Sequence, residues 1–330
     1  DGLLALHPAL PGLHARWSAG ELVVVHATGL PYRERSHFDA QQVLESGGER
    51  PFALDTGWLG RALAGSHAKG MAFQSTVPLA LRGHADVDTW APSVRPDPAA
   101  DLVARLERLY AGDAPLAAAL VRARELRGDM PASATTGAMS GTMAGAAAPT
   151  PAGARDGPVA LAHQAAGFLA RPDGPQAAVL ELGGWDSHAN QAADPGPLTN
   201  RLRLLDATLA ALHDGLTAPD AGNAWARTVV LVVTEFGRTV AMNGNQGTDH
   251  GSGGAAFVLG GAVRGGRVIA DWPGLAPAQR HEGRDLRITT DLRAVFKTVL
   301  QQHLGVSAAR VAGEVLPGSA ALATLPLLRG

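Results

Sequence analysis

The chain has 330 residues, of which 46% are hydrophobic and 18% charged, so it is long enough for one large α/β domain or two small ones. A formal net charge of −2, with no long run of like charge, makes nucleic acid an unexpected partner. No apolar run approaches the about 20 residues of a membrane span, and the absence of cysteine excludes disulfides, zinc–thiolate sites and cysteine nucleophiles.

Short apolar runs predict strands that are buried on both faces, as in a parallel sheet covered by helices. They lie at residues 22–27, 177–182, 228–234 and 255–260. Apolar residues spaced by three and four predict helices over 102–109, 202–216 and 292–300, and Thr290 or Asp291 is placed to cap the last of these. A further helix is expected from Phe38 to Leu44, ending at Gly47. The alternation of strands and helices predicts a doubly wound α/β sandwich.

Two segments interrupt this pattern. Residues 84–98 are polar and contain prolines, which is typical of an excursion above the sheet, and residues 131–154 consist almost entirely of small residues. We therefore expect a single α/β domain over 1–330 that carries an excursion and a low-complexity loop or lid over 84–157.

Polar side chains follow the predicted strands, at the edge of an open α/β sheet where ligands usually bind. The candidate metal ligands are Asp186, His188, Glu235, Asp249 and His250. Mixed oxygen and imidazole donors suit zinc, manganese or iron, so the pattern indicates a divalent metal site.

A simpler interpretation of these residues stays open. Asp186 would then cap a turn, His188 would be a surface histidine, and Glu235 would be a solvated carboxylate or a partner of Arg238.

Ser36 is the candidate nucleophile because it precedes a predicted helix, whose first backbone N–H groups attract anions. Arg33 and Arg35 strengthen the expectation of an anion site, since guanidinium groups bind phosphate or sulfate in a bidentate way. The alternative is that Ser36 only caps the helix. His37 is equally compatible with a core position or with a role behind the metal ligands.

Several motifs carry a family resemblance. RSHFDAQ at 35–41, GWLGRALA at 57–64, GGWDSHANQ at 183–191, TEFGRT at 234–239, GTDHG at 247–251 and TTDLRAV at 289–295 resemble the bacterial domain-of-unknown-function 1501 family. The resemblance covers nearly the whole chain. It implies an alkaline-phosphatase-like three-layer α/β/α sandwich with a mostly parallel sheet. It also implies export, to the periplasm, because members often carry twin-arginine signals.

The resemblance further implies a metal-dependent hydrolase of phosphate or sulfate esters, acting on a small molecule or a glycan. Ser36 would be its nucleophile, and one or two ions of zinc, manganese or calcium would be its cofactor. Relatives supply another Asp ligand from a strand that we expect upstream of Asp1. Phe236 stands where relatives have a ligating imidazole, so either Asp249 holds a second ion or a single ion binds.

Two other functions stay open. The chain can be a catalytically inactive binding or surface-assembly protein that keeps the fold, because a fold does not determine a function. It can also be a phosphotransferase, which passes the phosphoryl group to an acceptor other than water.

Overall fold

The computed structural model describes residues 4–92, 98–128, 153–193 and 195–330. The chain divides into two compact units, Asp1–Thr89 with Arg155–Gly330, and Trp90–Ala154. Among the described helices, none has the length and apolar character that crossing a membrane requires.

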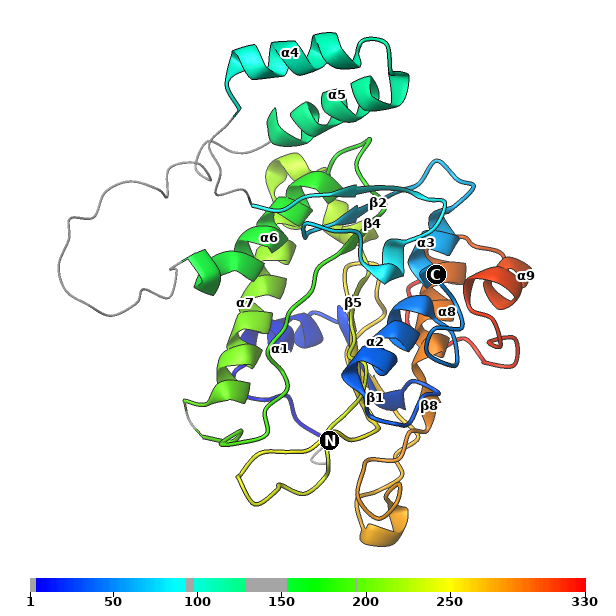
Figure 1. Cartoon of the computed structure of the whole chain (residues 1–330). Coiled ribbons are helices and arrows are strands. Elements are labelled where there is room, and N and C mark those ends of the chain that lie inside the picture. Colours follow the sequence, from blue (N-terminus) through cyan, green and yellow to red (C-terminus); the bar gives the residue numbers. More distant parts are fainter. Residues whose placement is uncertain (1–3, 93–97, 129–152, 194) are drawn as a thin grey trace, which may run out of the picture. The chain divides into compact units, whose positions relative to one another are not determined.

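The larger sheet lies at the centre of the first unit (Figure 1). Its strands, in spatial order, are β5 (Val230–Val232), β6 (Gly254–Leu259), β1 (Leu22–Gly29) and β7 (Arg267–Ile269), and β8 (Thr290–Asp291) pairs with the end of β1. β7 and β8 run parallel to β1, whereas β6 runs antiparallel to both β1 and β5. The sheet is therefore mixed, and the expectation of a mostly parallel sheet holds only in part, because an apolar run shows that a strand is buried and not which way it points.

A smaller parallel sheet has the order β3 (Asp86–Thr89), β2 (Lys69–Ala72), β4 (Ala177–Val179). The sequence placed residues from 84 onward in an excursion, but Asp86–Thr89 pairs with β2 as an edge strand. The second unit begins only after this strand, at Trp90.

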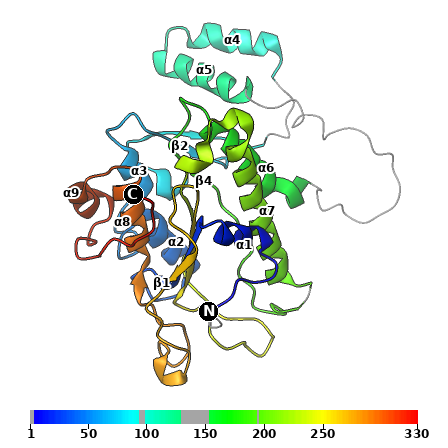
Figure 2. The same ribbon diagram turned by 180° about the vertical axis from the view of Figure 1, so that it is seen from behind.

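Helices lie on both sides of the larger sheet (Figures 1 and 2). α1 (Pro11–Ser18) and α7 (Pro197–Thr217) lie on one side, and α2 (His37–Ser46) and α8 (Leu292–Gln302) lie on the other. In the main core, α8 packs against β1, and the ring of Phe296 stacks on Trp58 with centroids 4.5 Å apart.

Local signals for the helices are confirmed. Asp291 caps α8, since its carboxylate accepts from the Arg293 backbone N–H at 2.9 Å. Gly47 ends α2 in the left-handed conformation with φ +69°, which glycine adopts without steric cost. The other described helices of the first unit are α3 (Trp58–Leu63), α6 (Gly153–Leu169), which belongs to this unit from Arg155 onward, and α9 (Ala308–Arg310). One-turn helices lie at Leu79–Leu81, Pro219–Ala221, Ala224–Arg227, Pro277–Gln279 and Val311–Val315.

In the second unit, α4 (Ala100–Tyr110) and α5 (Ala114–Gly128) form a helical hairpin. α4 confirms the helix predicted over 102–109, and an ion pair between Glu107 and Arg124 joins the two helices. The small-residue segment predicted as a loop or lid lies, up to residue 152, outside the described residues.

Phe296→Ala should lower the free energy of unfolding by about 3–5 kcal/mol, because it removes a fully buried aromatic side chain (1% exposed) and leaves a cavity. Urea denaturation measures the change. The control Leu275→Ala removes a 43% exposed side chain and should change stability by less than about 0.5 kcal/mol. Equal denaturation midpoints for the two variants would contradict this account of the core.

Candidate metal centre

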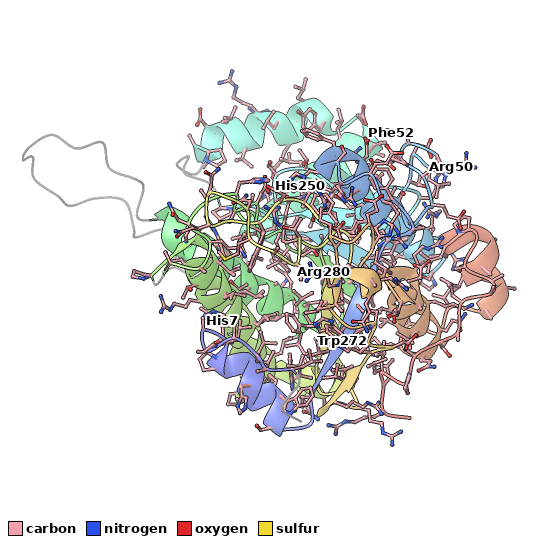
Figure 3. The ribbon with its side chains drawn as sticks, turned by 90° about the horizontal axis from the view of Figure 1, so that it is seen from below. His7, Arg50, Phe52, His250, Trp272 and Arg280 are labelled. Atoms are coloured by element: carbon pink, nitrogen blue, oxygen red, sulfur yellow. The ribbon has the colours of Figure 1, made fainter. Side chains whose placement is uncertain are left out.

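Segments that are distant in the sequence bring a group of donor side chains together. His37 is the first residue of α2, Asp186 lies in the loop after β4, and His250 lies in the loop before β6. One donor atom from each of these three residues lies within 4.8 Å of the other two. His250 lies near the middle of the view in Figure 3, whereas Phe52 lies toward its edge. We call these three residues the metal-site triad.

The donor atoms of the triad lie at short distances from one another. His37 Nε2 lies 3.1 Å from His250 Nε2, and Asp186 Oδ1 lies 3.1 Å from His250 Nε2. Asp186 Oδ2 lies 3.4 Å from His37 Nε2. Ligands of one tetrahedral zinc, at bond lengths of about 2.0–2.1 Å, are separated by about 3.3–3.4 Å. The three donors are therefore spaced as the ligands of a single small cation.

The other nitrogen of each imidazole is already occupied. His37 Nδ1 lies 2.7 Å from Glu235 Oε1, and His250 Nδ1 lies 3.0 Å from the backbone carbonyl oxygen of Arg35. Because both partners are acceptors, each Nδ1 carries the proton, and in the neutral ring each Nε2 presents a lone pair. Two lone pairs and a carboxylate that face one another repel, so a proton or a metal ion has to lie among them.

The triad is accessible to solvent. The side chains of His37, Asp186 and His250 are 36%, 42% and 26% exposed. Structural zinc sites are closed by four protein ligands, whereas catalytic sites have three and keep one position open. Three ligands at the surface are thus typical of a site that admits another molecule.

His188 and Asp249, both predicted as ligands, lie beside the triad. His188 Nε2 is 2.8 Å from Asp186 Oδ1 and 3.2 Å from His250 Nε2, and its Nδ1 is 3.3 Å from Asp249 Oδ1. A hydrogen bond from Asn243 and then one from His188 lower the pKa of Asp249. Asp249 therefore contacts the site through His188.

Glu235 and Phe236 act on the imidazole rings. Glu235 was predicted as a ligand, but its carboxylate orients His37 from behind. The ring of Phe236 packs against His37 and His250, with centroid separations of 4.7 and 4.9 Å. Phe236 cannot bind a metal, yet it holds two of the residues that can.

Arg238 pairs with Asp186 and not with Glu235, with its Nη1 atom 2.6 Å from Asp186 Oδ1. Burial acts to raise the pKa of Asp186, but the hydrogen bond and positive charge of Arg238, together with the adjacent imidazoles of His250 and His188, outweigh burial and lower this pKa from 3.8 to about 2. Asp186 is therefore a carboxylate at any physiological pH, as a metal ligand must be.

The predicted nucleophile and anion-binding residues have other partners. Ser36 is the N-cap residue of α2, but it makes no capping hydrogen bond and instead bonds to the side chain of Tyr32. The Arg33 guanidinium donates to the Leu30 carbonyl. The structure thus brings residues 35–37 to the site through the backbone carbonyl of Arg35 and the side-chain ring of His37.

The Arg35 guanidinium is engaged away from the triad. It donates to Asp285 at 2.9 Å and to Glu282 at 2.5 Å. Both contacts leave its charge neutralised by carboxylates, so the geometry lends no support to the predicted anion-binding role.

In the metal-free protein, Arg238→Gln should raise the pKa of Asp186 from about 2 toward 3.8, because it removes the guanidinium. The folded-state pKa lies below the unfolded value, so the stabilisation from Asp186 is complete above about pH 4 and is lost as pH falls to about 2. Carboxyl ¹³C NMR titration measures the Asp186 pKa in the wild type and in the variant. Arg227→Gln, on an exposed turn, is the control and should leave the Asp186 pKa unchanged. An Asp186 pKa that does not respond to Arg238→Gln would overturn this assignment.

The family model described as "Protein of unknown function (DUF1501)" matches residues 20–316. None of the curated proteins and none of the solved structures that were compared with the chain match it. The matched range contains each member of the metal-site triad as well as Glu235, Phe236 and Arg238. The chain therefore belongs to the DUF1501 family.

Proposed function

We propose that this protein is a metal-dependent hydrolase of phosphate or sulfate esters. The observation that carries the proposal is the triad itself, in which two imidazole nitrogens and a carboxylate converge at 3.1–3.4 Å at the protein surface. A divalent ion held there would polarise a phosphoryl or sulfuryl oxygen and lower the pKa of a nucleophilic hydroxyl. Two imidazoles among three ligands favour zinc or manganese over calcium, which prefers oxygen donors.

The charge of the site favours an anionic substrate. The triad contains one carboxylate, so a divalent ion would leave a charge of +1 among the ligands themselves, and Arg238 adds a positive charge beside Asp186, whereas the carboxylates of Glu235 and Asp249 lie behind the imidazoles of His37 and His188. A positive centre that is open to solvent attracts an anionic ester more strongly than a neutral one. We infer that the ester belongs to a small molecule or a glycan.

Ser36 is the proposed nucleophile because it immediately precedes His37 at the start of α2. Its hydroxyl is hydrogen-bonded to Tyr32, whose own hydroxyl donates to Asp39 Oδ2 at 3.1 Å. This chain offers the Ser36 proton a route toward a carboxylate. In the proposed step, Ser36 Oγ forms a bond to phosphorus or sulfur while the bond to the ester oxygen breaks, and water then releases the covalent intermediate.

The family resemblance belongs to the same proposal. The mixed sheet with helices on both sides supports an alkaline-phosphatase-like sandwich, and the resemblance supports export to the periplasm. The alkaline-phosphatase-like sandwich and the export to the periplasm are thus parts of the proposal, in addition to the α/β architecture and the family membership described above.

Purified wild-type protein should contain about one equivalent of zinc or manganese, and a second ion beside His188 would double this content. It should also hydrolyse aryl phosphate or sulfate esters. Asp186→Ala removes a charged ligand and should lower metal affinity and hydrolysis at least about 10–100-fold. Elemental analysis and an ester-hydrolysis assay measure the two quantities.

The controls remove the same residue types from the surface. They are Asp214→Ala, at a 72% exposed side chain on α7, and His67→Ala, at an exposed position, and neither should change metal content or rate. Equal metal content and rate in Asp186→Ala and wild type would end the proposal. Bound metal without turnover would favour the inactive binding protein, and phosphoryl transfer to an acceptor would favour the phosphotransferase.

Ser36→Ala should abolish ester hydrolysis and leave the metal content unchanged, because the nucleophile is lost and the triad is intact. Steady-state rates and elemental analysis on one preparation test this separation. Undiminished hydrolysis in Ser36→Ala would show that water, and not Ser36, attacks the ester.

A further inference from the structure

Asp285 is a fully buried carboxylate, 0% exposed, that lies outside the triad. Its Oδ2 atom accepts from Arg35 Nε and from Ser252 Oγ, both at 2.9 Å, and its Oδ1 atom accepts from Arg284 Nε at 2.8 Å. Two of these donors are charged, so the buried negative charge is well compensated.

The donors to Asp285 lead to His250 from two sides. The backbone carbonyl oxygen of Arg35 accepts a hydrogen bond from His250 Nδ1 at 3.0 Å, and Arg284 Nη2 donates to the His250 backbone carbonyl at 2.6 Å. Ser252 lies two residues further along the His250 loop. Asp285 is thus one side chain removed from both the ring and the backbone of a triad member.

Arg35 has to be held for this arrangement to persist. Its φ of +58° lies in the left-handed region, which residues with a side chain rarely adopt without support from their surroundings. The support comes from the carboxylates of Asp285 and Glu282. If Arg35 relaxed to a negative φ, its carbonyl would turn away from His250 Nδ1.

We propose that Asp285 is a positioning residue for the metal site. Through Arg35 and Arg284 it keeps His250 in the tautomer that is protonated at Nδ1, with the Nε2 lone pair directed at the rest of the triad. The purpose of this arrangement, metal binding, rests on the proposed function. The tautomer of His250 does not rest on the proposed function, since we infer it from the contact between His250 Nδ1 and the Arg35 carbonyl oxygen.

The variant Asp285→Asn in the full chain tests the proposal, because asparagine keeps the shape of the side chain and removes its charge. In the metal-free protein, ¹⁵N NMR of the imidazole nitrogens reports the His250 tautomer, and isothermal titration calorimetry with zinc reports the affinity. We expect a single Nδ1–H tautomer in wild type and a mixture in Asp285→Asn. Zinc should bind about 10–100-fold more weakly to the variant.

Glu282→Gln is the matched control. Glu282 pairs with the same arginine, but its side chain is 61% exposed, and exposed ion pairs contribute little. The control should keep the wild-type tautomer and a zinc dissociation constant within about threefold of wild type. A general loss of stability does not shift a tautomer, so this measurement separates positioning from a purely structural role.

A folded Asp285→Asn with the wild-type tautomer and affinity would overturn the proposal. If Asp285→Asn does not fold, Arg284→Ala replaces it as the test variant. The Arg284 side chain is 44% exposed and contacts both Asp285 and the His250 backbone, so its loss should leave the fold intact. An unchanged tautomer in folded Arg284→Ala would overturn the proposal as well. Zinc binding without ester hydrolysis in wild type would instead refute only the proposed function.

Discussion

The candidate site depends on one contact, in which His37 Nε2 and His250 Nε2 face each other at 3.1 Å and would repel each other as neutral rings protonated at Nδ1. Neither ring can relieve this contact by moving its proton, because Glu235 and the Arg35 carbonyl hold both Nδ1 atoms as donors. A shared cation converts the repulsion into attraction. The groups behind the rings are therefore as important to the site as the atoms that would touch the ion.

The site also depends on the joint folding of both sheets of the first unit. Asp186 follows β4 of the smaller sheet, whereas Glu235 and His250 flank strands of the larger sheet. The loop after β4 has to reach the edge of the larger sheet, and Arg238 secures it there by pairing with Asp186. Loss of either sheet would separate the ligands, although each sheet has its own hydrophobic core.

Family membership by itself supplies no chemistry here, since the family is described only as a protein of unknown function. The function has to be argued from the site. Phe236 illustrates why, because its sequence position suggested a lost ligand. The structure shows a ring that packs against the imidazoles of His37 and His250. The presence of Phe236 in place of an imidazole is therefore weak evidence that the protein has lost an activity.

The sequence by itself determined the strands β1, β4, β5 and β6, the helices α2, α4, α7 and α8, the Asp291 cap and the Gly47 helix end, because burial periodicity and capping act over a few neighbouring residues. It did not identify β2, β3, β7 or β8. It also placed Asp186 and His250 at strand ends, where ligands of an α/β sheet gather. Tertiary structure alone decided that β6 is antiparallel, that His37 joins the triad, and that Asp285 pairs with Arg35 across 250 residues. Strand direction and the partner of a charged side chain follow from how distant segments pack, and no local pattern of residues records that packing.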